Sequence, residues 1–423
     1  GFRRFRLGAD GAYLGVQRVD DLVALQPFPG ASTRTSTLVL VKGQPTRYPV
    51  PYHRWRPQGA GRRADDVTIE RLWAAPTGPV GDAADPRAPW MLQPDGVAAP
   101  TGPAPRQPGD DEYHAHAGAY SGGQNGVYWL ELLGPVGESG PGLVRVRNRA
   151  EASKGGLRGV ERVIEAASVF PLLRWGDLRP FCAEPAGHLL LVQDAERRRG
   201  VPEPLLAEEQ PRTLAYLREF EPELRARAAY RRYFRSTGNP GGDAPFYTMY
   251  DVGPYTLSPW KTVWRRMDRR LGAAVIGPRA LPGETSLRPV VPQETCVLIA
   301  AASEAEAHYL CGLLSSAVLT YQIEGQSVRG GKSFGSPGML AGLRLPRYRP
   351  GDAVHEALVD GSRAAHALAR RLRQADAATD PALAAALQRE LSTTRATLDE
   401  PAAALYGVPS ASLQAMRGAL AQP

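Results

Sequence analysis

Cysteine is scarce in this sequence, and long apolar runs are absent from it. The 423 residues include only three cysteines, Cys182, Cys296 and Cys311, which lie too far apart for a metal-knuckle spacing or a disulfide framework. No run of apolar residues is long enough to span a bilayer, and the first residues lack the apolar core of a signal peptide. These absences argue against disulfide-stapled, membrane-spanning and secreted proteins, and they predict a reducing, cytoplasmic setting.

Lysine is also rare, although the chain is basic. The formal net charge is +8, and the only lysines are Lys42, Lys154, Lys261 and Lys332, so arginine carries nearly all of the positive charge. Arginine is suited to phosphate and guanine recognition, but a GC-rich genome enriches it too. The length allows two or three domains, and the charge predicts a polyanionic partner.

Aromatic side chains recur through residues 245–264, and cations accompany and follow them. Aromatic rings can stack on bases and cations can neutralise phosphates, which would make this stretch a nucleic-acid contact surface. The alternative is a core hairpin whose rings face inward and whose cations are merely solvated. Both interpretations stand on the sequence, and the candidate DNA-contacting residues are Tyr247, Tyr255, Lys261, Trp264 and Arg265.

A second candidate contact lies in the glycine-rich loop 327–335. Arg329, Lys332 and Ser333 flank Gly330-Gly331 there, which brings cations and a hydroxyl onto a permissive backbone. Such a loop can bind phosphate or reach a base edge. An ordinary exposed turn is the competing interpretation.

Hydrophobic patterning predicts a mixed α/β chain. Strands are expected at residues 12–19 and 36–41, joined by a long loop in which Phe28 stands between two prolines. Two strands do not form a stable sheet alone, so we expect their partner strands outside this sequence, and the absence of an initial methionine fits that expectation. Residues 74–118 are rich in proline and glycine and are expected to be irregular. Beyond them we expect a hairpin over residues 128–146, a helix opened by Pro211, a helix capped by Ser303, and three C-terminal helices separated by Pro381 and Gly407.

Several segments, taken in order, resemble the N6-adenine DNA methyltransferases of restriction-modification and phage-defence systems, especially type IIG-like and BREX-like enzymes with a C-terminal target-recognition domain. The resemblance is spread over nearly the whole chain rather than concentrated in one motif. The segments that carry it are Pro27-Phe28-Pro29-Gly30-Ala31-Ser32, Thr46-Arg47-Tyr48-Pro49-Val50-Pro51-Tyr52, Asn125-Gly126-Val127-Tyr128-Trp129, Pro171-Leu172-Leu173-Arg174, Pro245-Phe246-Tyr247, Gly253-Pro254-Tyr255-Thr256, Lys261-Thr262-Val263-Trp264-Arg265, Glu304-Ala305-Glu306-Ala307-His308-Tyr309-Leu310 and Leu405-Tyr406-Gly407.

The family's catalytic Asn/Asp-Pro-Pro-Tyr/Phe motif and its glycine-rich motif for S-adenosylmethionine are not in this sequence. The resemblance therefore implies the terminal strands of a Rossmann-like methyltransferase sheet in residues 1–73 and an irregular connection in 74–118. A mixed α/β target-recognition domain would occupy 119–350, followed by a helical region in 351–423. It implies duplex DNA as partner, a prokaryotic cytoplasm, and an N-terminal methyltransferase half supplied elsewhere. S-adenosylmethionine would be the cofactor of the complete enzyme, with no cofactor, catalytic residue or metal expected in this chain alone.

Three functions follow as hypotheses. In the first, the chain selects the DNA sequence for a methyltransferase that flips an adenine and methylates its amino nitrogen, with Phe28 either stacking on the flipped base or packing a turn. In the second, the chain is a free-standing DNA-binding specificity subunit without catalytic activity. The third is a metal-dependent nuclease using Asp110, Asp111, His114 and His116, which lacks the carboxylate-and-lysine spacing expected of such a site.

Overall fold

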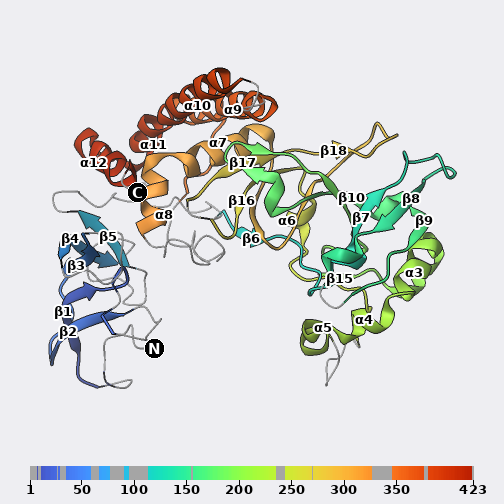
Figure 1. Cartoon of the computed structure of the whole chain (residues 1–423), viewed down its shortest axis with the longest axis horizontal. Helices are drawn as coiled ribbons and strands as arrows, with labels where there is room; N and C mark the ends of the chain where they lie inside the picture. Colours follow the sequence, from blue (N-terminus) through green and yellow to red (C-terminus); the bar gives the residue numbers. More distant parts are fainter. Residues whose placement is uncertain are drawn as a thin grey trace.

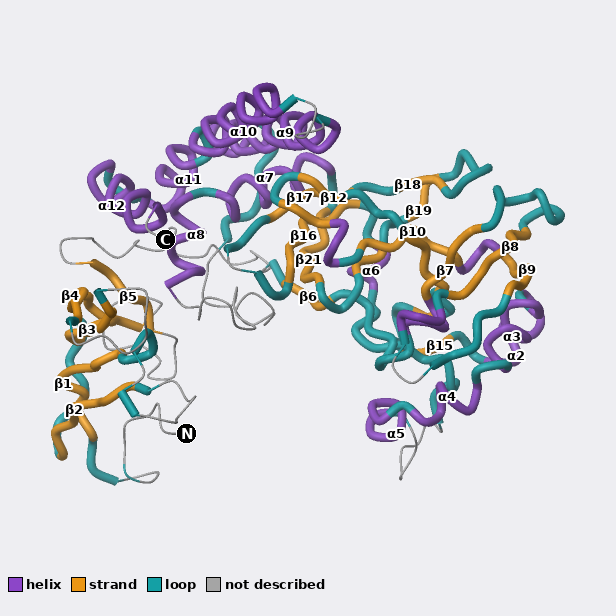
Figure 2. Tube along the Cα trace, in the orientation of Figure 1, coloured by secondary structure: helices purple, strands orange, loops and turns teal. Residues whose placement is uncertain are grey.

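The structure is a computed structural model that describes residues 7, 11–25, 27–28, 35–58, 66–76, 90–94, 113–153, 156–234, 243–268, 270–325, 345–375 and 380–421. Helices alternate with strands of several sheets, so the predicted mixed α/β class is confirmed. The N-terminal sheet lies at one end of the elongated molecule and a six-stranded sheet at the other (Figure 1). A four-stranded sheet and the C-terminal helices lie between them (Figure 2).

The N-terminal sheet has the strand order β2-β1-β3-β4-β5. β1 and β2 are the two predicted strands, and they pair antiparallel from Leu14 opposite Lys42 to Asp21 opposite Ser36. β1 runs parallel to β3, whereas β3, β4 and β5 pair antiparallel in turn. The bounds are β1 Leu14–Asp21, β2 Ser36–Lys42, β3 Val50–Pro57, β4 Val67–Pro76 and β5 Trp90–Pro94.

This sheet corrects two expectations. β1 and β2 find their partners in β3, β4 and β5 of this chain, and β5 lies inside the segment expected to be irregular throughout. β3 was missed because charged side chains break its apolar alternation. In the structure Arg54 Nη1 and Arg56 Nη2 each lie 3.2 Å from Glu70 Oε2 on β4, so cross-strand charge pairs replace apolar ones.

The six-stranded sheet has the order β20-β10-β13-β7-β8-β9 and contains the predicted hairpin, with Leu132 opposite Val146. The predicted helix at Pro211 is α3, which buries Leu214 and Leu217 in the core that the sheet shares with its neighbouring helices. The bounds are α1 Asn125–Tyr128, β7 Trp129–Leu132, β8 Leu143–Asn148, β9 Glu161–Glu165, β10 Val169–Leu173, β13 Gly187–Leu190, α2 Glu203–Glu209, α3 Pro211–Arg218, α4 Glu221–Ala226, α5 Ala228–Tyr233 and β20 Val291–Pro292.

The four-stranded sheet is antiparallel, with the order β17-β16-β21-β6. Helix α7 contacts β16, β17 and β21, and the Ser303 hydroxyl accepts the Glu306 N–H at its start, as predicted. α7 also crosses α9 closely: a Cβ on Gly312 would lie 2.6 Å from the Leu358 carbonyl oxygen, so this crossing requires glycine. The bounds are β6 Ala115–Ala117, α6 Pro254–Leu257, β16 Trp260–Arg265, β17 Ala273–Ile276, β21 Cys296–Ala301, α7 Glu304–Ser315 and α8 Ala317–Gly325.

Short elements connect these sheets. Within the described ranges, three two-stranded ribbons pair β11 with β12, β14 with β15, and β18 with β19, and three 3-10 turns precede strands or loops. Their bounds are η2 Ala150–Ala152, η3 Ala166–Ser168, η4 Trp175–Asp177, β11 Leu178–Arg179, β12 Cys182–Ala183, β14 Gln193–Asp194, β15 Arg199–Gly200, β18 Arg279–Ala280 and β19 Leu287–Arg288.

The C-terminal region forms four helices where the sequence predicted three: α9 Ala353–Gln374, α10 Pro381–Ala396, α11 Asp399–Tyr406 and α12 Ser410–Ala421. Gly407 ends α11 in the left-handed conformation at φ 59°, as its position indicated. The extra break precedes α11, where the Asp399 carboxylate accepts the Ala317 N–H at 2.7 Å and Arg417 Nε at 2.7 Å. These long-range contacts fix the break, and Pro401 in the first turn of α11 was the local signal for it that the sequence prediction missed.

Candidate nucleic-acid interface

The aromatic stretch predicted to contact DNA is largely core. Tyr247 is fully buried and Trp264 is 1% exposed, so neither ring can reach a base. The Tyr247 hydroxyl donates to the Val201 carbonyl at 2.6 Å, and its own carbonyl accepts the Tyr128 hydroxyl at 3.0 Å. The predicted DNA contacts by Tyr247 and Trp264 are therefore wrong, because tertiary packing turns their rings inward.

Lys261 is also buried rather than available to phosphate. It lies on β16, between β17 and β21, with no exposed surface. Its ammonium donates to the Ser258 carbonyl and, at 3.0 Å, to the Val290 carbonyl. Burial lowers the pKa of this amine to about 7. The predicted phosphate contact by Lys261 is wrong, because the side chain is fully buried and two backbone carbonyls accept from its ammonium.

Arg265 lies at the end of β16 against Trp175. Its guanidinium carbon is 4.0 Å from the centre of the Trp175 ring, and Nε donates to the Trp175 carbonyl at 3.1 Å. Asp268 accepts from Nη1 at 3.2 Å. The Arg265 guanidinium is thus held by a ring and a carboxylate, and its side chain is only 15% exposed. These contacts within the protein engage the positive charge that was predicted to bind phosphate.

Tyr255 lies at a surface and stacks on a residue far away in sequence. Its ring lies parallel to the His116 imidazole, with centroids 3.6 Å apart and planes 4° apart, and both residues are partly exposed. Burial lowers the pKa of His116 and raises the pKa of Tyr255. The positive charge of Arg198 also acts on both groups, so this arginine lies within electrostatic range of the stacked pair.

Arg198 belongs to a hairpin that sequence reasoning missed. We call residues 193–200 the arginine hairpin: β14 and β15 pair Asp194 with Arg199, and Arg197, Arg198 and Arg199 are consecutive. The Asp194 carboxylate accepts the Arg197 N–H at 2.9 Å, and Arg198 is in the left-handed conformation at φ 52°. The run of three arginines before a glycine was the available sequence signal, but the local sequence did not show that its charge acts on Tyr255.

The remaining predicted contacts lie elsewhere or outside the described residues. Phe28 is 59% exposed in the loop after β1, where its ring is open to a ligand. Arg329, Lys332 and Ser333 fall outside the described residues, so their predicted DNA contacts stay predictions. The structure therefore brings together Tyr255, His116 and Arg198, of which only Tyr255 was predicted as a contact.

Metal-ligand clusters and membrane-spanning helices are both absent from the part of the chain that the structure describes. No cluster of histidine, cysteine and carboxylate side chains there could hold a metal ion. His116 stacks on Tyr255, and Asp110 and Asp111 lie outside the described ranges. The three cysteines are free and buried. Among the described helices, none combines the length and apolar character needed to cross a bilayer.

Comparison with known proteins gives structural likenesses but no sequence match. No family model and no curated protein matches this chain. Among solved structures, the chain is similar to the type IIL restriction-modification enzyme MmeI, whose structure was determined in complex with DNA, with a TM-score of 0.48 and 12% sequence identity. The match covers 96% of this chain and 46% of that one, so this chain spans about half the length of the enzyme.

Proposed function

We propose that this chain binds duplex DNA, and that the arginine hairpin contributes to the contact. The observation that carries the proposal is the run Arg197-Arg198-Arg199 at a tight hairpin turn, with the charge of Arg198 within electrostatic range of the partly exposed His116–Tyr255 stack. Guanidinium groups bind phosphate oxygens by paired hydrogen bonds, and partly exposed rings offer a face to the sugar or base. The net charge of +8 favours the same partner.

Within that class, we propose the target-recognition part of a site-specific adenine-N6 DNA methyltransferase of a restriction-modification or phage-defence system. The ordered motifs of the sequence support this assignment. The complete enzyme would transfer a methyl group from S-adenosylmethionine to an adenine flipped out of the duplex. This chain would position the duplex and select its sequence, with Phe28 and the loop bearing Arg329 and Lys332 as further candidate contacts.

The first test measures duplex affinity as a function of salt. Arg198→Gln should reduce the slope of log affinity against log salt by about 0.9, because one phosphate contact is lost. The matched control is Arg389→Gln, an exposed arginine on α10 that removes the same charge from a different part of the chain. Equal slopes for wild type and Arg198→Gln would contradict a phosphate contact by the hairpin. Absence of any salt-sensitive duplex binding would overturn the proposed function.

The methyl-transfer chemistry needs residues that this sequence does not contain. Its one Asn-Pro pair, Asn239-Pro240, is followed by two glycines rather than by Pro-Tyr. We therefore propose that the cofactor binds to a methyltransferase half outside this chain. Calorimetry of the chain with S-adenosylmethionine should give no saturable heat. Stoichiometric binding would contradict the assignment of cofactor binding to another segment.

A free-standing specificity subunit is the second candidate function, and the N-terminal sheet supports it. β1 and β2 had implied missing partner strands, but β3, β4 and β5 provide them and share a small core of Val16, Val19, Val50 and Ala74. Reading the coding sequence directly upstream separates the two candidates. An in-frame Asn-Pro-Pro-Tyr motif would support the methyltransferase, and a stop codon with an unrelated gene would support the subunit.

A further inference from the structure

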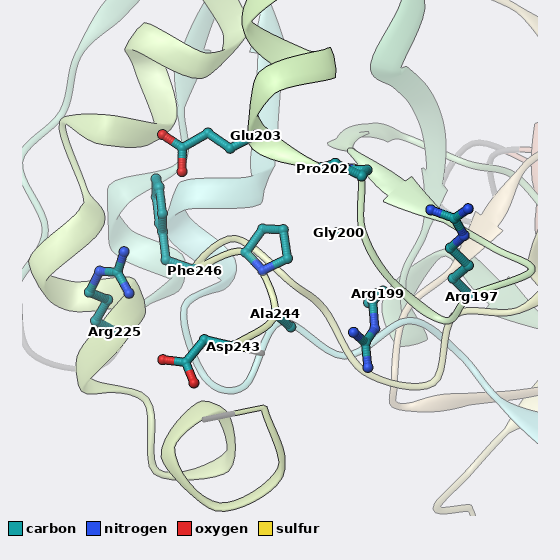
Figure 3. Close-up of a pocket in the computed structure, with 10 residues that line it drawn as sticks. Arg197, Arg199, Gly200, Pro202, Glu203, Arg225, Asp243, Ala244 and Phe246 are labelled. Atoms are coloured by element: carbon teal, nitrogen blue, oxygen red, sulfur yellow. The ribbon is translucent and has the colours of Figure 1, made fainter. Parts of the chain in front are cut away.

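A pocket of about 830 Å³ is lined by the arginine hairpin on one side and by residues near 203, 225 and 243–246 on the others. Arg197 and Arg199 border one side of it and Arg225 the other, with Glu203 and Asp243 also at its rim (Figure 3). Pro202, Ala244 and Pro245 add apolar surface. Its volume falls within the range of pockets that take small organic ligands, which exceeds the needs of a bare ion.

Most of the charges around this pocket are already engaged. Arg225 Nε donates to Glu221 at 2.6 Å, and its guanidinium lies over the Phe246 ring at 5.3 Å. Glu203 accepts from Arg218 at 2.6 Å, so that carboxylate is neutralised from outside the pocket. Arg197 Nε lies 3.6 Å from an Asp194 carboxylate oxygen, close enough for ion pairing but longer than a good hydrogen bond.

Arg199 is different, because no described residue supplies an acceptor for its guanidinium. The residue is only partly exposed, and it lines the pocket. A guanidinium carries five N–H donors and stays charged at any physiological pH. A partly buried guanidinium that has no acceptor among the described residues is suited to an anionic ligand that presents several oxygens, which phosphate does.

The backbone beneath Arg199 is held firmly in place. Gly200 N donates to the Thr248 hydroxyl at 3.0 Å, and Val201 N donates to the Val192 carbonyl at 3.1 Å. A Cβ on Gly200 would lie 2.9 Å from the Tyr247 ring and 3.1 Å from Pro245 Cβ. The hairpin thus lies directly on residues 245–248, which reduces the ordering cost of binding.

We propose that this pocket binds a phosphate-bearing ligand of nucleotide size, with the Arg199 guanidinium on the phosphate and Arg197 supporting it. Two sources share this chemistry: a phosphate of the DNA strand, and a free nucleotide. The DNA source rests on the proposed function, whereas the phosphate site itself does not. The buried Phe246 ring is covered by Arg225, so the ligand is held by its phosphate rather than by base stacking.

The experiment titrates the full chain with 5′-AMP, using adenosine as the ligand control that lacks phosphate. Wild type should bind AMP saturably and adenosine at least tenfold more weakly, because hydrogen bonds to a charged phosphate are lost. Arg199→Gln should weaken AMP binding at least tenfold, and Arg199→Lys less, since it keeps the charge but loses the fork. Arg179→Gln, an exposed arginine on β11, is the matched control. Melting curves check that each variant folds.

The outcomes separate the two sources and the two proposals. Displacement of AMP by duplex DNA assigns the pocket to a strand phosphate, and binding of AMP without displacement assigns it to a free nucleotide. Equal binding of AMP and adenosine, or equal AMP affinity of wild type and both Arg199 variants, overturns the phosphate site. The proposed DNA function would survive that result if the Arg198→Gln salt dependence holds, and it would fail separately if no duplex binds.

Discussion

Lowering the pH from 6.5 to 4 is expected to reduce the free energy of unfolding by about 3 kcal/mol through His366 alone. Burial lowers the pKa of this histidine from 6.5 to about 4. Because the unfolded chain takes up the proton first, the stabilisation is complete above pH 6.5 and is lost as the pH falls through 4. His308 adds to the effect in the same direction, since burial beside His366 lowers its pKa to about 3.

The hydrogen bonds of His366 explain why it resists protonation. Val275 N donates to Nε2 at 2.9 Å, so Nε2 must be unprotonated. Nδ1 then carries the hydrogen and donates to the Ser362 carbonyl at 2.7 Å. A proton on Nε2 would face the Val275 N–H, a donor against a donor, in a site that is 9% exposed. The imidazole thus links α9 to β17 only while it is neutral.

The measurement is urea unfolding at several pH values between 7.5 and 4. His366→Gln removes the titrating group and should flatten the dependence, even if it lowers stability at pH 7.5. The exposed His114, replaced by glutamine, controls for loss of a histidine as such. An unchanged pH dependence in His366→Gln would show that other groups dominate acid unfolding.

The second large effect concerns Lys261, and it also raises stability with pH, but in the range above pH 7. Burial lowers the pKa of its amine from 10.5 to about 7, so the unfolded chain holds this proton over a range where the folded chain does not. Stability therefore rises with pH above 7, by about 2 kcal/mol between pH 7 and 8.5. The window stops there because cysteine thiols of the unfolded chain begin to ionise near pH 8.5.

Lys261→Met tests this expectation, since it keeps an unbranched side chain in the sheet but removes the titrating group. The variant should show little rise in stability between pH 7 and 8.5, and Lys42→Met, at an exposed lysine of β2, should retain the wild-type rise. DNA affinity provides an independent reading. Because the ammonium is buried, Lys261→Met should leave the salt dependence of duplex binding unchanged. A reduced slope would restore the phosphate contact that the structure contradicts.

The sequence by itself determined the class of fold and many local elements. The mixed α/β class, β1 with β2, the 128–146 hairpin, α3 from Pro211, the Ser303 cap of α7 and the break at Gly407 all follow from local patterning. These elements are readable because their signals lie within a few residues: alternation, a cap or a left-handed glycine. The basic charge and ordered motifs likewise supported a DNA partner without any contact being known.

Only the tertiary structure decided which of these residues face solvent. A lysine or tyrosine has the same local signal whether a sheet covers it or leaves it open, so Lys261, Tyr247 and Trp264 looked available and are buried. Conversely, His116 stacks on Tyr255, with the charge of Arg198 within electrostatic range, because residues far apart in the chain fold to one surface. Whether a side chain is buried depends on contacts from distant segments of the chain. These contacts bury the core aromatics and leave the residues of the candidate interface partly exposed.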